Sequence, residues 1–454
     1  MKKIYAIGAA ACLFASCKPS VNITTPPTAG TAVFTNYLAI GNSLTAGYAD
    51  NSLTISGQLN SYPERLFEQF QLVGAKGPFI QPLLPGDNGW PSAKLVLSTV
   101  GNCMLDTSLG PIPYQGSLDS AGSYHYDATK NNGQINNIGV PGIRIADYPV
   151  AMYAYGNRYA GRFYVNPVGT PMDELRYRVN NQAVTFFTMW LGANDVLGYA
   201  TGGGQGDGTG NATPAGGTGS YYNLTDITPT AVFEKYYDSA VTVAISTGAK
   251  GALINIPDVT AIPFFTTIPA DGLTLARQGQ ADTLQAYWAA GGWNKVFQPG
   301  ANYFVITDHN GQIRQAVPGE LILMTVPQDS ILCAGWGSVK PIPAKYVLTT
   351  DELQFIRSAI STFNAHIKDV ADLHQLAYVD MNACMKTIAS GITYNGIKYN
   401  AQYVSGGAFS LDGVHLTPRG YALVANYILT SINAYYHSTI PLTDVNSYSG
   451  IRFP

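Results

Sequence analysis

Short apolar runs alternate along the chain with longer segments in which apolar residues recur at helical spacing. The runs are nearly free of charge, and most of them end at Gly or just before Gly or Pro, which is typical of strands buried on both faces. The predicted strands cover residues 33–41, 136–140, 183–191, 252–256 and 376–381. Because strands and helices alternate, we expect an α/β fold with a parallel sheet covered by helices on both faces.

The clearest helical segment follows Thr349 and Glu352, which form a candidate capping box, and it carries apolar residues at i, i+3 and i+4 spacing up to Val370. Residues 75–130 have no clear periodicity and are expected to be mostly loop. The other helices are expected over residues 63–73, over 228–248 and from 417 onward. The predicted inward residues of the last two are Val232, Tyr236, Ala240 and Ile245, and Val424, Ile428, Ile432 and Tyr435.

The alternation is interrupted between residues 260 and 345. Within this region, apolar runs at 303–306 and 313–324 flank an Asn310–Gly311 pair, which predicts a hairpin. We therefore expect an inserted α+β subdomain or cap. Residues 202–219 are dominated by Gly and are expected to form a flexible, solvated loop.

The N-terminus has the pattern of a secretory signal. Two lysines precede a short apolar stretch, residues 4–14, which is too short to cross a bilayer as a permanent helix. Two small residues then precede Cys17, an ending that resembles a bacterial lipobox, in which the Cys is lipidated. The alternative is an ordinary cleavage site with an incidental Cys. We expect a lipoprotein signal peptide over residues 1–16 and a tether over 17–32.

Composition excludes several classes of protein. With 46% hydrophobic and 12% charged residues, the chain is not intrinsically disordered. It carries 25 basic and 28 acidic residues without a dense basic run, so nucleic acid is not an expected partner. The histidines show no metal-ligand spacing, and no metal is expected. Past the signal, Cys103, Cys333 and Cys384 allow either one bridge with a free thiol or three buried thiols.

Polar residues follow the predicted strands at the end where parallel sheets bind ligands. Ser43 comes just after Gly41, where its hydroxyl would face the crevice, although Ser is also a favoured helix N-cap. Gly142 follows a Pro and would offer an unobstructed N–H, or would simply form a turn. Asn194 follows strand 183–191, and its amide would donate to an oxyanion or cap a loop.

Asp412 and His415 are three residues apart on a short loop before the last helix. At this spacing the carboxylate would fix the imidazole tautomer, which leaves the other ring nitrogen to deprotonate a Ser. This pattern predicts a nucleophilic Ser site.

Four blocks in chain order resemble those of the GDSL-type SGNH hydrolases: GNSLTAG at Ser43, NIGVPG at Gly142, GAND at Asn194 and DGVH at His415. The stretch LDGVHLTPRGYALVANYI and the 260–345 region are similar to lipoprotein members of this family from Bacteroidetes-type bacteria. The resemblance implies a flavodoxin-like three-layer fold with a central parallel sheet of about five strands and a large inserted α+β cap.

The resemblance also implies roles for these residues. Ser43 would be the nucleophile, His415 the general base and then acid, and Asp412 the group that orients His415. The backbone N–H groups of Ser43 and Gly142, with the Asn194 side chain, would form the oxyanion hole. The family's usual Asp before the Ser is Asn42 here, from which we expect a local adjustment rather than loss of activity.

By resemblance, the chain is expected to be a serine hydrolase that cleaves carboxylic esters through an acyl-enzyme, without metal or organic cofactor. Esterase, lipase and carbohydrate O-acetylesterase activities all fit, with an acylated carbohydrate or lipid as substrate. The alternative is a non-catalytic glycan-binding surface lipoprotein on the same scaffold, but the complete set of Ser, Gly, Asn, Asp and His argues against it.

The expected hydrolase domain comprises residues 33–259 and 346–440, and residues 260–345 form the inserted subdomain. A lipid on Cys17 would anchor the protein in the bacterial cell envelope after export, with the outer membrane favoured.

Overall fold

The computed structural model describes residues 26–119, 134–213 and 222–453. Its centre is a five-stranded sheet in the order β13-β6-β5-β1-β4, and every neighbouring pair in it is parallel. This confirms the expected central parallel sheet of about five strands. The strands are β1 Tyr37–Gly41, β4 Asn137–Gly139, β5 Phe186–Trp190, β6 Lys250–Ile254 and β13 Ala377–Val379.

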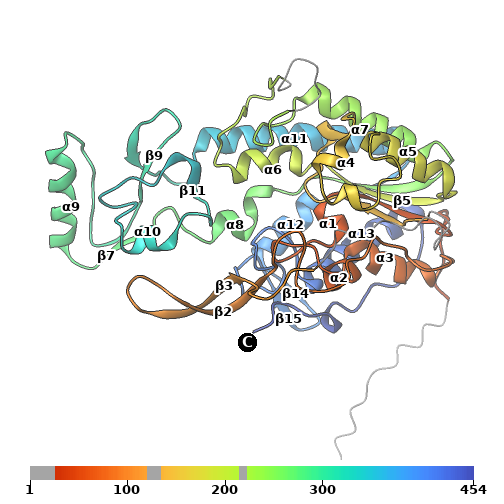
Figure 1. Ribbon diagram of the computed structural model, residues 1–454, viewed down its shortest axis with the longest axis horizontal. Helices are drawn as coiled ribbons and strands as arrows, with labels where there is room; N and C mark the ends of the chain where they lie inside the picture. Colours follow the sequence, from red (N-terminus) through yellow and green to blue (C-terminus); the bar gives the residue numbers. More distant parts are fainter. Residues whose placement is uncertain (1–25, 120–133, 214–221, 454) are drawn as a thin grey trace, which may run out of the picture.

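Helices cover both faces of the sheet, so the core has three layers (Figure 1). One helical layer contains α5 Pro171–Asn181, α6 Asn194–Thr201, α7 Thr230–Ile245 and α11 Thr350–Leu373. The other contains α3 Tyr62–Gln71, α12 Met381–Ser390 and α13 Pro418–Tyr436. Shorter helices lie in the connections: α1 Ser43–Ala46, α2 Ile55–Leu59, α4 Tyr153–Gly156, η1 Ile145–Asp147, η2 Ala160–Arg162 and η5 Val445–Ser447.

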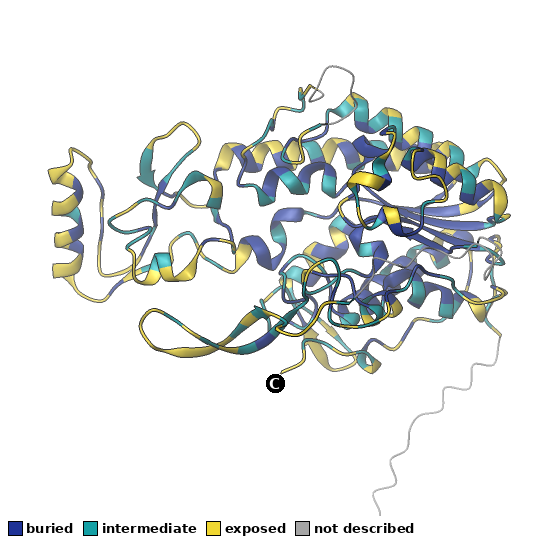
Figure 2. Ribbon diagram, in the orientation of Figure 1, coloured by how far each residue is buried: buried dark blue, intermediate teal, exposed yellow. Residues whose placement is uncertain are grey.

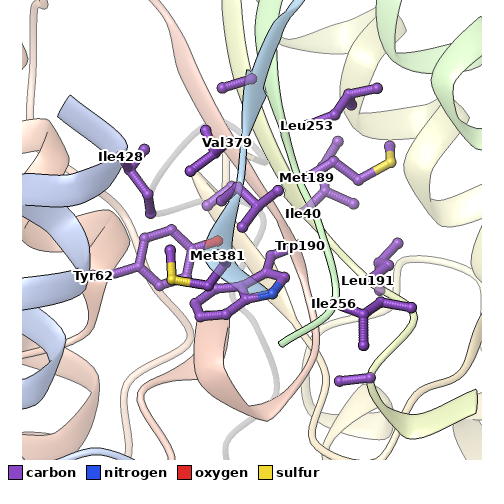
Figure 3. Packing of buried hydrophobic residues seen from close by; sticks show 14 of the residues in the cluster. Ile40, Tyr62, Met189, Trp190, Leu191, Leu253, Ile256, Val379, Met381 and Ile428 are labelled. Atoms are coloured by element: carbon purple, nitrogen blue, oxygen red, sulfur yellow. The ribbon is translucent and has the colours of Figure 1, made fainter. Parts of the chain in front are cut away.

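β1 and β5 are buried along their whole length on both faces, as their mainly apolar sequences predict (Figure 2). Trp190 lies in the middle of this core with no exposed surface, and its ring packs edge-on against Tyr62 of α3 at a centroid distance of 5.4 Å (Figure 3). Burial of such apolar surface is the main term that holds the helical layers on the sheet.

The face that each helix buries agrees with the sequence for α11 and in part for the others. In α11 all six predicted positions from Leu353 to Val370 are buried, and the capping box is present, with Thr349 N–H donating to Glu352 at 2.6 Å. The predicted inward face of α7 is confirmed only at Ala240. In the first half of the helix it is wrong by one position, because Phe233 and Tyr237 are buried instead of Val232 and Tyr236. Because α7 packs against both α5 and α11, its buried stripe is broad, and Phe233 stacks on Phe363 of α11 at 4.0 Å.

In α13 the predicted inward residues Val424, Ile428 and Ile432 are buried, but Tyr435 is 43% exposed and Tyr436 takes its place. The Tyr436 hydroxyl donates to the carbonyl of Gly251 on β6 at 2.7 Å. This hydrogen bond draws the last turn toward the sheet on the Tyr436 side.

Between β6 and α11 the chain leaves the three layers and forms a protruding α+β region (Figure 1). It has two buried apolar clusters of its own, one around Phe304 and Ile306 and the other around Leu284 and Trp288. Its elements are η3 Val259–Ala261, α8 Pro263–Thr266, β7 Leu273–Leu275, α9 Gln278–Ala290, β8 Gly300–Asn302, β9 Val305–Thr307, β10 Ile313–Gln315, β11 Leu321–Ile322, α10 Gln328–Leu332, η4 Ala344–Tyr346 and β12 Val347–Leu348.

The predicted hairpin in this region is confirmed only in part. β9 and β10 pair antiparallel around the Asn310–Gly311 turn. The run 313–324, however, is not one strand, because β10 ends at Gln315 and the chain turns before β11, which pairs with β12. The apolar residues of this run therefore belong to two separate sheets.

The region expected to be loop contains an antiparallel hairpin formed by β2 Leu95–Gly101 and β3 Thr107–Pro113. A disulfide joins Cys103 at its tip to Cys333 at the end of α10, and Cys384 is a buried free thiol. Of the two possibilities left by the sequence, one bridge with one free thiol is correct. A second small hairpin, β14 Ile392–Tyr394 and β15 Ile397–Tyr399, precedes the loop before α13.

The described part of the Gly-rich segment is only partly solvated: Gly203 and Gly204 are buried, whereas Gln205, Thr209 and Asn211 are exposed. A Cβ on Gly203 or Gly204 would lie 2.4 Å from the Lys345 carbonyl and 2.6 Å from the Glu352 carboxyl carbon, respectively. These glycines therefore permit close approach of the backbone to the N-terminus of α11. Residues 214–219 lie outside the described residues.

Residues 1–25, including Cys17 and the expected signal peptide, also lie outside the described residues. Within the described ranges, the structure has no helix that is long and apolar enough to cross a membrane.

Candidate active site

The sheet order places three of the four sequence blocks beside one another. β1 lies between β4 and β5, and Gly41 at its end pairs with Gly139 on one side and Trp190 on the other. Because these strands are parallel, the segments that follow them leave from the same edge. The loops that carry Ser43, Gly142 and Asn194 therefore start side by side.

Ser43 is the first residue of α1 and is 8% exposed. Asn42 caps this short helix, and its side-chain oxygen accepts a hydrogen bond from Leu44 N–H at 3.0 Å. A Cβ on Gly139 would lie 2.5 Å from Ala46 N, so α1 can rest on β4 only because that residue is Gly. Asn42 thus keeps the capping function that a carboxylate would serve, without the charge.

The structure brings Ser43, His415 and Asp412 together, although 372 positions separate the first two in the sequence. The His415 Nε2 lies 2.8 Å from Ser43 Oγ, and its Nδ1 lies 2.9 Å from Asp412 Oδ2. The ring of Tyr48 packs against the imidazole at a centroid distance of 4.6 Å. With Nδ1–H donating to the carboxylate, Nε2 is left as the acceptor that faces the hydroxyl.

Asp412 is held by donors on both of its oxygens. Oδ1 accepts from Val414 N–H at 2.9 Å, His415 N–H at 2.8 Å and the Ser410 hydroxyl at 3.0 Å, while Oδ2 accepts from Asn51 N–H at 2.9 Å. Burial by itself raises the pKa of Asp412, but His415 and these N–H groups outweigh it and hold the pKa well below its ordinary value. The Asp412 carboxyl group is therefore ionised in the folded protein at neutral pH.

The three predicted oxyanion donors differ in their surroundings. Ser43 N–H is at the first turn of α1 and has no intrahelical acceptor. Gly142 has φ +83°, with open space where a Cβ would stand, and within the described residues its N–H has no acceptor. Asn194 donates through Nδ2 to the Ile143 carbonyl at 2.9 Å, which ties it to the Gly142 loop and leaves the second amide hydrogen available.

The sequence reasoning missed the role of Asp195. This fully buried carboxylate accepts from Ile145 N–H at 2.9 Å, Ala146 N–H at 3.2 Å and the Thr228 hydroxyl at 2.7 Å. Burial raises its pKa to about 6, against the lowering effect of these donors. It joins α6 to the loop after Gly142. The sequence feature that could have indicated this role is the position of Asp195 directly after the Asn of the GAND block.

Two outlying parts of the fold are attached near Ser43 and His415. Phe264 N–H of α8 donates to the Gly413 carbonyl at 3.0 Å, and Met324 N–H donates to the Phe264 carbonyl at 3.0 Å. The β2–β3 hairpin is attached to a different segment through Leu95 N–H, which donates to the Asp50 carbonyl at 2.8 Å. The disulfide joins the hairpin to the protruding region.

Within the part of the chain that the structure describes, no group of three or more His, Cys, Asp or Glu side chains is arranged to hold a metal ion. The site as described consists of a hydroxyl, an imidazole, a carboxylate and a set of N–H donors. Together these groups can carry out nucleophilic acyl transfer.

Comparison with known proteins identifies the family of the chain. The model of a family described as GDSL-like lipase/acylhydrolase matches residues 37–428. No curated protein matches. Among solved structures, the chain is similar to a candidate acylhydrolase from Bacteroides fragilis, with 14% identity, 70% of this chain and 82% of that chain covered, and a TM-score of 0.26. Such a low score adds no argument, so the assignment stands on the family match.

Proposed function

Because the chain belongs to the GDSL-like lipase and acylhydrolase family and is a hydrolase of ester bonds, we propose that it cleaves carboxylic esters through an acyl-enzyme on Ser43. The observation that carries the proposal is the chain of contacts from Ser43 Oγ to His415 Nε2 at 2.8 Å and from His415 Nδ1 to Asp412 at 2.9 Å. A hydroxyl needs such a base to become nucleophilic at neutral pH.

In the proposed first half-reaction, His415 Nε2 takes the proton of Ser43 as Oγ bonds to the ester carbonyl carbon. The carbonyl oxygen becomes an oxyanion, and the new imidazolium is stabilised by Asp412. Collapse of the tetrahedral intermediate breaks the bond to the alkoxy oxygen, which leaves as alcohol with the proton from His415. Water then repeats the sequence on the acyl-enzyme and releases the acid and free Ser43.

The oxyanion would be received by Ser43 N–H, Gly142 N–H and the free amide hydrogen of Asn194. The first two have no acceptor within the described residues, so they are free to bind the oxyanion without first breaking a hydrogen bond. The Asn194 amide is oriented by its hydrogen bond to Ile143. Donors fixed in place before the reaction are worth more than mobile ones, since they need no reorganisation.

For the substrate we propose a short acyl group on a carbohydrate. A small, partly open cavity next to α1 is lined in part by Ala46, Pro141 and Tyr159, and its volume of about 10 Å³ has room for one water-sized group. Ser43 and His415 lie near this cavity but do not line it. Tyr48 and Tyr159 also place aromatic rings beside the site, with their centroids 6.1 Å apart. Aromatic side chains are common in the lining of small-molecule sites, and their flat faces suit the C–H face of a sugar.

The test is hydrolysis of p-nitrophenyl acetate, butyrate, octanoate and palmitate by the protein and by Ser43→Ala. We expect acetate to be preferred and the variant to lose turnover and labelling by a fluorophosphonate. A preference for octanoate or palmitate would replace the carbohydrate ester by a lipid. Turnover that survives in Ser43→Ala would refute the proposed nucleophile.

We also propose that the protein is exported and anchored in the bacterial cell envelope, with the outer membrane favoured, through a lipid on Cys17. The support is the sequence alone, namely a short apolar stretch ending in two small residues before that Cys. Growth with labelled palmitate should label the protein but not Cys17→Ser. Equal labelling of both forms would rule out this anchor.

A further inference from the structure

We propose that Asp50 is a positioning residue for the Asp412–His415 pair, and that the two-residue turn Asp50–Asn51 keeps that pair aligned with Ser43. None of the four sequence blocks contains either residue of the turn. The inference rests on the proposed function, since it concerns the Asp412–His415 pair that activates Ser43 in that function.

The turn has a strained but well-defined geometry. Ala49 and Ser52 exchange two backbone hydrogen bonds, at 3.1 and 3.0 Å, which closes a hairpin with Asp50 and Asn51 as its central residues. Their φ values are +52° and +60°. Successive positive φ values define a turn that Gly, Asn and Asp tolerate best. Because Asp and Asn occupy this turn instead of Gly, the turn carries side chains that can form further hydrogen bonds.

Three hydrogen bonds join this turn to the segment that carries Asp412. Asp50 N–H donates to the Ser410 hydroxyl oxygen at 3.0 Å, and Leu411 N–H donates to Asp50 Oδ1 at 2.9 Å. Asn51 N–H donates to Asp412 Oδ2, the same oxygen that accepts from His415 Nδ1. The Ser410 hydroxyl in turn donates to Asp412 Oδ1. A shift of the turn would therefore move both carboxylate oxygens relative to the imidazole.

The two sides of the contact come from distant parts of the chain, about 360 positions apart, and these hydrogen bonds help to hold them in register. The segment of Asp412 has a second attachment, through Gly413 to Phe264, on the side of the protruding region. The Asp50–Asn51 turn supplies the attachment on the side of the β2–β3 hairpin, because Leu95 N–H also binds the Asp50 carbonyl.

The charge of Asp50 acts on the same pair. The titratable and charged groups that face it are Asp412, His415, Lys94, Tyr403 and Tyr421. Burial, with a further contribution from Asp412, raises the pKa of Asp50 to about 6, although the Leu411 N–H bond, Lys94 and His415 lower it. Above that pH the carboxylate is ionised, and its negative charge favours the imidazolium that forms on His415 during turnover.

The experiment compares Asp50→Ala and Asp50→Asn with the wild-type full chain in detergent, on p-nitrophenyl acetate from pH 5 to 8. Asp50→Ala loses the acceptor for Leu411 and should lower kcat by about 10- to 100-fold with KM nearly unchanged, because misplacement of reacting groups acts on the transition state. Asp50→Asn keeps the acceptor and should restore most of that loss.

The pH dependence separates positioning from a merely structural role. The ratio of wild-type to Asp50→Asn kcat should be near one at pH 5 and rise several-fold by pH 8, with its midpoint near pH 6, where Asp50 titrates. A ratio independent of pH would overturn the contribution of charge. Should Asp50→Ala fail to fold, this ratio and the rate of fluorophosphonate labelling of Ser43 in Asp50→Asn still test the proposal.

Asp106→Asn is the matched control, because it removes one carboxylate charge at the exposed tip of the β2–β3 hairpin, away from the Asp412–His415 pair. Its kcat should stay close to wild type at every pH. Wild-type kcat in a folded Asp50→Ala, with Ser43→Ala inactive, would overturn the role of Asp50 and leave the proposed function standing. Activity in Ser43→Ala would instead overturn the proposed function itself.

Discussion

Asp412→Asn removes the carboxylate that orients His415 while leaving the shape of its loop nearly intact. In the wild-type protein, Oδ1 accepts from Val414 N–H, His415 N–H and Ser410, and Oδ2 accepts from Asn51 N–H and His415 Nδ1–H. An Asn that keeps its oxygen at the three-donor position puts its NH₂ group where Oδ2 was. That group can only donate, so His415 Nδ1 must become an acceptor and Nε2 then carries the hydrogen. In this tautomer Nε2 cannot take the proton of a hydroxyl.

The magnitude follows from two contributions. An imidazolium and a carboxylate whose charges lie roughly 4 Å apart attract each other by about 4 kcal/mol at an effective dielectric constant near 20. Since each 1.36 kcal/mol is a factor of about ten in rate, losing this attraction lowers kcat by about 10³-fold. The wrong tautomer adds to this loss, and we expect a total of about 10³- to 10⁴-fold. KM should change little, because the lost interaction forms in the transition state.

The assay is steady-state hydrolysis of p-nitrophenyl acetate at pH 7 to 8, with circular dichroism as the check on folding. A second readout is the free energy of unfolding against pH. The pKa of Asp412 is lowered in the folded state, so its stabilisation is present above an unfolded pKa of about 3.9 and is lost as pH falls further. The wild-type advantage over Asp412→Asn should therefore be full at pH 7 and shrink below about pH 4. A variant with turnover within threefold of wild type would refute the assigned role of the carboxylate.

Three further predictions concern other contacts of the fold. Asn194→Ala should lower kcat by about 10²- to 10³-fold while remaining folded, and near-normal kcat would exclude its amide from the oxyanion hole. Burial raises the Asp195 pKa to about 6, so folding favours its protonated form, and the unfolding free energy of the wild type should fall as the pH rises from 4 to 7. Asp195→Asn should make this fall less steep. An unchanged dependence on pH in denaturant titrations would contradict this. Reduction, or Cys103→Ser with Cys333→Ser, should lower stability by about 2–4 kcal/mol, and a melting temperature that is indifferent to reductant in the wild type would show that the bridge adds no stability.

The elements that were predictable are those whose sequence pattern depends on one local environment. The run 183–191 consists of apolar, β-branched and aromatic residues because both faces of β5 are buried, and the observed bounds of β5 fall inside this run. The long α11 buries mainly one stripe, so its 3–4 spacing identified six of its eight buried residues, all except Glu352 and Ala371. α7 contacts two other helices, and its several apolar stripes left the choice of face to its neighbours.

The residues of the candidate site also divide into those that the sequence predicted and those that it did not. The blocks around Ser43, Gly142, Asn194 and His415 were recognisable because each is a short run of residues at a strand end or on one loop. The Asp50–Asn51 turn and the role of the buried Asp195 were not recognised, and the sequence allowed one disulfide without deciding which cysteines form it. Each depends on partners far away in sequence: 361 positions for Asn51 to Asp412, and 230 for the disulfide. No local pattern records such a separation.

The sequence by itself determined the alternation of elements, the parallel sheet and the residue types at the strand ends, since these follow from periodicity and backbone preference. Tertiary structure alone decided that His415 reaches Ser43 at 2.8 Å, that the protruding region attaches to the loop of Asp412, and that the β2–β3 hairpin attaches to Asp50. The physical reason is that hydrogen-bond geometry requires two groups to meet within a few tenths of an ångström. That precision comes from the packing of the whole core.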